Sequence, residues 1–317
     1  MTPTSLGAHS STKGTVVSFI KSNLHWKISA LSLAASLALA SPAAAQSPAA
    51  KPGVFENLSL FAGPDGSKQP QDLGINANMG LRVAANWGLP ISEKLKLGAQ
   101  IGAGVNVSDA AVHVLDQIEG TSKRTQMFAT VGLFQRPTER VTWGLAYDML
   151  SQRYYDNSQL GQLRGQASFS VRSADDVGVW FTKGVQGDSG VMGSTAVHLD
   201  PITQINGFTR HTWANMAQTA VWLGVAKQHG DVVWVFPENS KDTNVLVYGA
   251  ELSMPLSDRF AVTGSANLIT PAATGTVDAF LGLSFFPKRS ALRQARDTFA
   301  PVHAVANNPT MAIDLRR

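Results

Sequence analysis

Ser189 is the residue of this chain best placed for nucleophilic chemistry, because it lies in the short segment Gly187-Asp188-Ser189-Gly190. A serine hydroxyl attacks an acyl group when a histidine accepts its proton and an acid orients that histidine. His113 and Asp148 precede Ser189 in the chain and are candidates for these two roles. Gly, Asp and Ser are equally the ordinary residues of a loop. Since a triad is recognised by its geometry, which a sequence does not contain, we expect a loop here.

The segment around Ser189 resembles the nucleophile motif of chymotrypsin-like proteases, which are also exported and rich in β-structure. It departs from that motif at Val191, where the family expects a further glycine. His113 is flanked by Val112 and Val114 and lacks the small-residue context that the family has before its catalytic histidine. The sequence therefore does not favour a protease.

A second group of polar residues falls in the longest predicted loop, where a substrate could meet them. It consists of His198, Asp200 and His211. Outer-membrane hydrolases place serine, histidine and acid groups near the outer rim, but no diagnostic spacing links these three residues, and no His-Glu-x-x-His pattern is present. The chain has no cysteine, which excludes disulfides and thiolate metal sites. We expect no enzyme activity, no catalytic residue, no cofactor and no metal.

An N-terminal export signal is predicted over residues 1–45. Lys13, Lys21 and Lys27 precede a short apolar run, residues 28–39, and a small-residue segment that ends at Ala45. This order is typical of a cleaved secretory signal, and the run is shorter than the ~20 residues that a spanning helix needs. Cleavage removes three lysines and no acid, so the net charge falls from +4 to +1. Binding of nucleic acid therefore loses its support from composition.

The elements expected to position any site are β-strands. Every odd position from Ile75 to Trp87 is apolar, and the positions between them are polar or small. The segment from Leu95 to Val107 repeats the pattern. Successive side chains of a strand point to opposite faces, so each segment has one apolar and one polar or small face. Both segments are longer than a strand of a globular protein, which usually has about five or six residues, and they are long enough to cross a membrane obliquely. A half-buried sheet of a soluble protein is the alternative.

Twelve such segments predict an all-β fold, a closed antiparallel transmembrane β-barrel over residues 54–286, preceded by a short segment, 46–53. The predicted strands are 54–63, 75–87, 95–107, 124–135, 141–150, 163–172, 177–183, 212–227, 232–237, 244–254, 259–269 and 277–286. Connections after even strands are short, and three of them, at 89–94, 136–140 and 254–259, share a proline, a Ser or Thr, and an acid-base pair. The other two short turns are 173–176 and 228–231, whereas connections after odd strands are generally longer, up to 183–211. Short periplasmic turns and longer extracellular loops are typical of outer-membrane barrels.

Aromatic residues near the predicted periplasmic turns indicate an interfacial girdle. Those near the turns are Trp87, Trp143, Trp180, Trp222, Trp234 and Phe260. Trp180 breaks the alternation of its strand and is not assigned to the lipid face. Aromatic side chains that cap the core of a soluble barrel are the alternative interpretation.

Over residues 54–286 the chain resembles bacterial outer-membrane β-barrel proteins of the porin-like kind. Its last predicted strand ends in Phe285 and Phe286 and looks like the aromatic-ended strand that the assembly machinery of this family recognises. The resemblance implies the cell outer membrane as location, and outer-membrane lipid and the barrel-assembly machinery as partners. In that family the aromatic residue usually ends the chain, whereas residues 287–317 follow here.

The segment 287–317 has six basic and two acidic residues, a net charge of +4. We expect a basic periplasmic tail that is disordered, with contact to the anionic cell-wall polymer as the alternative. A short helix with Leu292, Ala295 and Phe299 on one face is a further alternative for this segment.

Polar residues on the inward phase of the alternation describe a possible pore wall. The lumen-facing candidates are Asn76, Asn78, Arg82, Lys96, Gln100, Asp148, Arg164, Arg172, Glu251 and Asp278. Groups of this kind tune selectivity in a hydrated lumen. They suit equally a barrel that is closed by its own hydrogen bonds and ion pairs. The first expectation is a passive channel for small hydrophilic solutes, the second a non-conducting structural or binding barrel, and the third an outer-membrane hydrolase.

Overall fold

The computed structural model describes residues 55–72, 77–111, 122–228, 243–270, 276–288, 290–292 and 297–316. The predicted export signal, residues 1–45, and the segment 46–53 lie outside these ranges and stay predictions. Within them, no helix has the length and the apolar character needed to cross a membrane.

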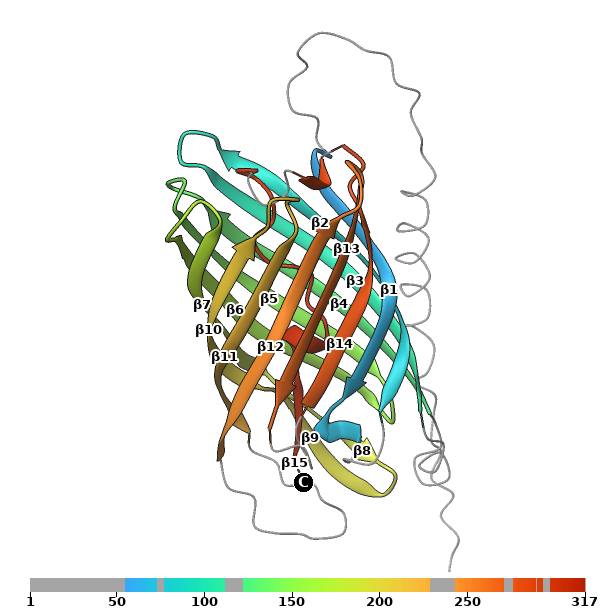
Figure 1. The fold of residues 1–317 in the computed structure, drawn as a ribbon. Coiled ribbons are helices and arrows are strands. Elements are labelled where there is room, and N and C mark those ends of the chain that lie inside the picture. Colours follow the sequence, from blue (N-terminus) through green and yellow to red (C-terminus); the bar gives the residue numbers. More distant parts are fainter. Residues whose placement is uncertain are drawn as a thin grey trace, which may run out of the picture. The chain divides into compact units, whose positions relative to one another are not determined.

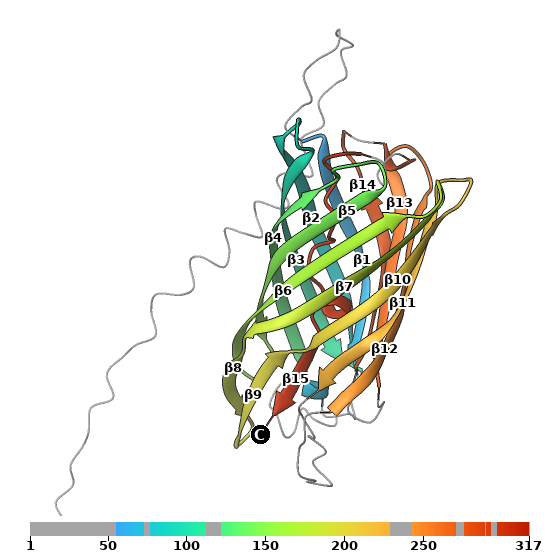
Figure 2. The same cartoon turned by 90° about the vertical axis from the view of Figure 1, so that its left-hand side faces the viewer.

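Twelve antiparallel strands close into a barrel, as Figure 1 and Figure 2 show. Around the ring they are β1 (Asn57–Lys68), β14 (Thr276–Phe285), β13 (Phe260–Ile269), β12 (Thr243–Pro255), β11 (Gln218–Gln228), β10 (Thr203–Thr212), β7 (Asp175–Gln186), β6 (Asn157–Ser170), β5 (Val141–Arg153), β4 (Lys123–Gln135), β3 (Leu97–Ala110) and β2 (Asn78–Ser92). The ring closes where β1 pairs with β14, with Leu60 opposite Phe285. The predicted all-β closed barrel is confirmed.

The alternation in the sequence separates the two faces of the barrel. On β2, Leu81 and Val83 have 69% and 50% of their surface exposed, whereas Arg82 between them has 3%. On β3, Ile101 is exposed and Gln100 is buried. Because a paired strand leaves only two directions for its side chains, one phase points outward and the other into the lumen. On these two strands the barrel is apolar outside and polar inside, the reverse of a water-soluble protein.

The two ends of the barrel differ in their connections. The turn rim is the end that has the tight turns 93–96, 136–140, 171–174, 213–217 and 256–259, and the loop rim is the opposite end. Thr138 Oγ1 accepts a hydrogen bond from the backbone N of Val141 at 3.1 Å, and Ser257 Oγ accepts one from the backbone N of Phe260 at 3.2 Å. The predicted Ser and Thr turn residues therefore stabilise the chain reversals as expected.

Strand β10 replaces part of a predicted loop. The sequence pattern assigns residues 212–227 to one strand, but a turn from Trp213 to Ala217 splits it, with the Trp213 N donating to the Ala217 O at 2.8 Å. Strand β10 lies within the predicted loop 183–211, and its outward phase has only Ile205 as a large apolar side chain, so the alternation was too weak to find it. The predicted strand 232–237 and most of the predicted turn 228–231 lie outside the described residues.

Part of the predicted aromatic girdle is wrong. Trp87 and Trp143 lie on the outward phase of their strands near the turn rim, and so does Phe260, which contacts Phe285. Trp222 instead points inward, is 9% exposed and makes an edge contact with Trp180 at 5.7 Å between ring centroids. Trp222 lies between two exposed apolar residues, Val221 and Leu223, so its phase already placed it inside. Trp234 lies outside the described residues.

A second, three-stranded sheet lies at the loop rim, at the lower end in Figure 1. It consists of β8 (Asp188–Met192), β9 (Thr195–Pro201) and β15 (Ile313–Arg316), in the order β15-β9-β8. The first two strands form a hairpin between β7 and β10, and β15 is the end of the chain. None of these three strands was predicted.

The C-terminal tail, defined here as residues 297–316, runs inside the barrel from the turn rim to the loop rim, where the end of the chain is marked in Figure 1 and Figure 2. It contains a 3-10 turn, η4 (Asn308–Thr310), and then β15. Val305, Met311, Ile313 and Leu315 are at most 2% exposed. The prediction of a disordered periplasmic tail is therefore wrong for these residues, because they bury apolar side chains that the charge count ignored.

Candidate functional site: the lumen and its tail

The tail enters the lumen at the turn rim, where Arg136 holds its backbone. Arg136 Nη1 donates to the carbonyl oxygens of Thr298 at 3.0 Å and Ala300 at 2.9 Å. Gly88 on β2 makes room for this part of the tail, since a Cβ atom at Gly88 would lie 2.0 Å from the Phe299 carbonyl oxygen. Arg136 in the turn thus binds the first residues of the tail, and the absence of a side chain at Gly88 lets them approach β2.

Further along the lumen, side chains of three strands bind the tail backbone. Gln100 both donates to the His303 carbonyl oxygen at 3.2 Å and accepts from the His303 N at 3.1 Å. Asn86 Nδ2 donates to the same carbonyl at 2.8 Å. Thr130 Oγ1 accepts from the Ala306 N at 2.9 Å. These contacts give the buried backbone of the tail the partners that it would otherwise have in a sheet.

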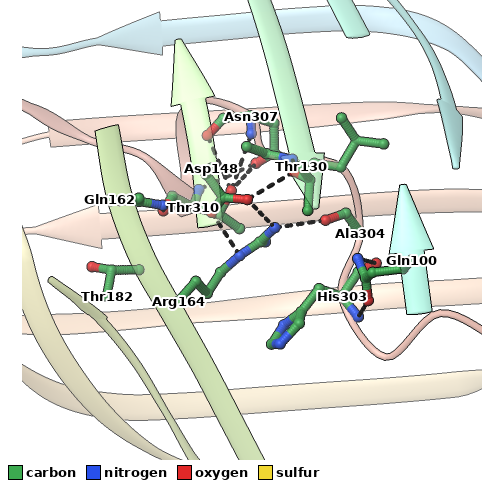
Figure 3. Close-up of polar contacts among 12 residues, drawn as sticks. Gln100, Thr130, Asp148, Gln162, Arg164, Thr182, His303, Ala304, Asn307 and Thr310 are labelled. Atoms are coloured by element: carbon green, nitrogen blue, oxygen red, sulfur yellow. Dashed lines mark hydrogen bonds and ion pairs between the residues drawn. The ribbon is translucent and has the colours of Figure 1, made fainter. Parts of the chain in front are cut away.

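Asp148 on β5 is the centre of a buried polar cluster, drawn in Figure 3. Arg164 Nη2 donates to Asp148 Oδ1 at 2.9 Å, and Arg164 Nε lies 2.9 Å from Oδ2. Thr130 Oγ1 and Gln162 Nε2 also donate to this carboxylate, at 2.7 and 2.9 Å. The same Arg164 Nη2 donates to the Ala304 carbonyl oxygen at 2.7 Å. The ion pair thus links the barrel wall to the tail.

Asn308 is the tail residue whose side chain the wall contacts most directly. Its Oδ1 accepts from Gln126 Nε2 at 2.9 Å, and its Nδ2 donates to Asp65 Oδ1 at 2.8 Å. Asn308 is 0% exposed. It begins the turn η4, in which Asn307 and Thr310 form a capping box.

A second buried polar group surrounds η1 (Pro70–Asp72), which follows β1 at the loop rim. Asp72 Oδ1 accepts from Asn78 Nδ2 at 2.6 Å and lies 3.7 Å from Arg124 Nη1. Burial raises the pKa of Asp72 above its ordinary value, and the charge of Arg124 opposes this rise. Asp278 on β14 accepts two hydrogen bonds from Gln69 Nε2, at 3.1 and 3.2 Å.

Two apolar clusters contain the tail residues just beyond η4. On one side, Met311 and Ile313 of the tail pack in one cluster with residues of β4, β5 and β6: Phe128, Leu150 and Leu160. On the other side, Ala312 packs in a cluster with residues of β10 to β13: Phe208, Trp222, Val245, Val247 and Ile269. In the ring order β4 lies opposite β12, and β5 lies opposite β13. Three consecutive tail residues therefore join apolar clusters from opposite walls.

Most of the lumen-facing candidates occupy the inner face. Asn78, Arg82, Gln100, Asp148, Arg164 and Asp278 are at most 4% exposed there. Glu251 follows the inward phase of β12 but is exposed. Lys96 and Arg172 lie in turns at the turn rim, so the prediction that they face the lumen is wrong: Lys96 has φ 50, and at both positions the alternation has already ended. Asn76 lies outside the described residues.

The candidate catalytic residues separate into two groups. The chain order His113, Asp148, Ser189 is wrong as a triad, because Asp148 is bound to Arg164 inside the lumen; His113 lies outside the described residues. His211 is not in an outer loop either, since it lies at the turn-rim end of β10, 2.7 Å from Asp175.

Ser189, His198 and Asp200 come together on one face of the β8–β9 hairpin. Ser189 pairs with His198 across the hairpin, and Ser189 Oγ lies 2.8 Å from His198 Nδ1. His198 Nε2 lies 3.4 Å from Asp200 Oδ2, the oxygen that Arg316 Nη2 approaches at 3.0 Å. A polar pocket of about 210 Å³ lies beside Asp200 and Arg316. No group of acidic residues and histidines in the described ranges could hold a metal ion.

The tail is a part of the site that was not predicted from the sequence. The signal that could have found it is the run of apolar residues Val302, Val305, Met311, Ile313 and Leu315, interrupted by an Asn-Asn-Pro turn. A solvated tail has no reason to contain such a series. The prediction of a solvated tail rested on its net charge, although most of its basic residues lie before residue 297.

Comparison with known proteins places the sequence in one family. Residues 57–313, which include most of the tail, match the model of a family of unknown function, DUF6666. No curated protein matches the sequence.

The fold is similar to several solved membrane barrels. One is the translocator domain of the autotransporter NalP from Neisseria meningitidis, at 12% identity and a TM-score of 0.43, with 82% of this chain and 95% of that chain covered. Another is KdgM porin, at 10% identity and a TM-score of 0.39, with 71% and 98% covered. A third is outer membrane phospholipase A from Escherichia coli, at 7% identity and a TM-score of 0.39, with 72% and 95% covered.

Proposed function

Because the chain belongs to a family of unknown function, its own residues must indicate its role, and we propose that it is an outer-membrane β-barrel closed to solutes by its own C-terminal tail. The observation that carries this proposal is the apolar layer formed by Met311, Ala312 and Ile313 between opposite walls of the barrel. A hydrated passage needs a continuous polar path, and this layer interrupts it.

The outer surface of the barrel supports the membrane location. Large apolar side chains such as Leu81, Val131, Leu145, Val221 and Leu281 are between 43% and 69% exposed on the outside of the ring. An apolar exterior around polar inward-facing residues is the layout that lipid requires of a barrel. With the turn rim in the periplasm, the tail starts at the periplasmic side, and its end lies at the outer surface.

This topology favours the second of the sequence-based alternatives over the first. An open passive channel needs the space that the tail occupies. A contact of the tail with cell-wall polymer is also not supported, because Arg316 is at the loop rim and is paired with Asp200. Recognition of the last strand, which ends in Phe285, by the barrel-assembly machinery stays part of the proposal.

Planar-bilayer recording of the purified full-length protein tests the closure. We expect no stepwise conductance, because the layer at Met311 to Ile313 spans the lumen. Folding of the same preparation is checked by the altered gel mobility of unboiled samples. Steady channels from folded protein would show that the tail does not close the barrel.

The arrangement of Ser189, His198 and Asp200 favours a hydrolase as a second candidate function. Ser189 Oγ has a histidine nitrogen at 2.8 Å that can accept its proton, and the other nitrogen of that ring faces a carboxylate at 3.4 Å. This is the order of contacts that activates a serine for attack. It opposes the expectation that the chain has no enzyme activity.

Labelling with a fluorophosphonate tests whether Ser189 is an active nucleophile. In this reaction Ser189 Oγ forms a bond to phosphorus, fluoride leaves, and His198 Nδ1 accepts the serine proton. If the site is active, one label is expected per chain, lost in Ser189→Ala and retained in Ser173→Ala, a change at an exposed turn serine. Folded protein that takes up no label at Ser189 contradicts the hydrolase.

A further inference from the structure

Most hydrogen bonds between the wall of the lumen and the tail go to the tail backbone. Side chains of β2, β3, β4 and β6, together with Arg136, contact backbone atoms of six tail residues: Thr298, Ala300, His303, Ala304, Val305 and Ala306. Gln162 adds a bond to the Thr310 carbonyl oxygen at 2.8 Å. Since every peptide has these backbone groups, such contacts recognise an extended chain with little regard to its sequence.

The wall of the lumen lacks side chains at the points where the tail comes closest. Glycines on three strands face the tail, and a Cβ atom at Gly88, Gly102 or Gly144 would lie 2.0 to 2.9 Å from tail atoms. At Gly102 and Gly144 the nearest tail atoms belong to the side chains of Val305 and His303, and at Gly88 the nearest is the carbonyl oxygen of Phe299. These glycines form a recess along β2, β3 and β5.

Asn308 adds one sequence-specific position to this recess. Both ends of its amide are hydrogen-bonded, one to Gln126 and the other to Asp65. An amide has a donor and an acceptor at fixed positions, so the pair Gln126 and Asp65 distinguishes it from a carboxylate or an alkyl group. Replacing it removes one hydrogen bond from Gln126, which keeps its bond to Gln152, and one from Asp65, which keeps its bond to Asn106.

The hydrogen bonds of the wall to the tail are replaceable. The tail adds no strand to the barrel, and in the described residues only β15 pairs with another strand, β9. If the tail leaves, water can enter the lumen and bind Arg82, Gln100 and Arg164 in its place. The barrel strands keep their own pairing, so the ring can stay closed whether or not a peptide fills the recess.

We propose that the inner wall formed by β2 to β6 is a binding site for an extended peptide, and that the tail is its tethered ligand. The ligand is an extended chain that, like the tail, has valine and histidine side chains against Gly102 and Gly144 and an asparagine at the Gln126–Asp65 position. The proposal rests on the tail-filled lumen of the proposed function and names what that lumen binds. A tether gives the tail an effective concentration in the millimolar range or so, so a free peptide competes only after the connection is cut.

The experiment cuts that connection in the full chain. A protease site is inserted between Leu292 and Asp297, and the cleaved protein is unfolded in urea and refolded with excess labelled peptide of residues 297–317. We expect the folded, unboiled band to retain one label per barrel. An otherwise identical peptide with Asn308→Ala is expected to bind about tenfold more weakly or worse, and a scrambled peptide is not expected to be retained.

Each outcome decides the proposal. Refolding only in the presence of the peptide also supports it, because the site is then filled in trans. A folded barrel without label, or equal retention of the scrambled peptide, overturns it, and so does a barrel that fails to fold even with the peptide. Closure is read separately, from the conductance of the intact chain. Conducting intact protein with retained peptide contradicts the proposed closure alone, whereas silent intact protein without retained peptide contradicts the peptide site alone.

Discussion

Replacing Ile313 with aspartate is expected to release the tail and to turn a silent barrel into a conducting one. Ile313 is 0% exposed and belongs to one of the two apolar clusters that form the proposed closure. An unpaired carboxylate buried there costs several kcal/mol. If the tail leaves the lumen, the new carboxylate is hydrated and the twelve barrel strands keep their pairing. The substitution should therefore displace the tail and leave the barrel folded.

Two measurements check this release. Planar-bilayer recording is expected to show stepwise conductance for Ile313→Asp, and added protease is expected to cleave its tail while the barrel still shows the mobility of a folded protein. Val191→Asp is the matched control, because it adds the same charge to the same small sheet at a position that is 49% exposed. Ile313→Ser is a milder variant in case the aspartate blocks folding. A folded Ile313→Asp protein that stays silent, with a protected tail, contradicts the role of the layer.

Replacing Arg164 with alanine is expected to lower the free energy of unfolding by about 3–5 kcal/mol. Asp148 is 0% exposed, and among the described residues Arg164 is the one cation in contact with it, with two nitrogens at 2.9 Å from the two carboxylate oxygens. The loss of Arg164 leaves this charge buried with only Thr130 and Gln162 as donors. It also removes the bond to the Ala304 carbonyl oxygen, so the tail is weakened together with the wall.

Denaturant unfolding in lipid vesicles, followed by tryptophan fluorescence, measures this change. Arg153→Ala is the matched control, because Arg153 is exposed near the end of β5 and its loss should cost about 0.5 kcal/mol or less. Adding Asp148→Ala to Arg164→Ala should recover part of the loss, since the uncompensated charge is then absent. If the double variant is as unstable as the sum of the two single variants, the ion pair is not what stabilises this part of the lumen.

Much of the barrel follows from local pattern. The alternation around Leu81 and Arg82 assigns each residue of β2 to one face without any knowledge of its partners, because the direction of a strand side chain depends only on the parity of its position. The turn at Thr138 is equally local, since the hydroxyl bonds a backbone group three residues away. The same parity put Asp148 and Arg164 on the inner face, but it did not pair them.

Local pattern fails where a side chain is assigned by proximity in the sequence. Trp222 was placed in the girdle because it lies near a predicted turn, whereas the parity of its strand points it inward to Asn267, at 2.9 Å from the indole nitrogen. Strand β10 was missed because its outward face has little apolar surface, and its pairing with β7 and β11 supplies what its own sequence lacks.

The sequence by itself determined the strand alternation, the tight turns and the inward polar residues, since each of these depends on neighbours a few positions apart. Only the tertiary structure decided that the lumen is filled. Ile313 meets Phe128, and Asn308 meets Asp65 and Gln126, across separations of 182 residues or more. It likewise decided that Ser189 faces His198, because the register of a hairpin selects the pair. Such contacts depend on the closure of the ring, which brings both walls within reach of one extended chain.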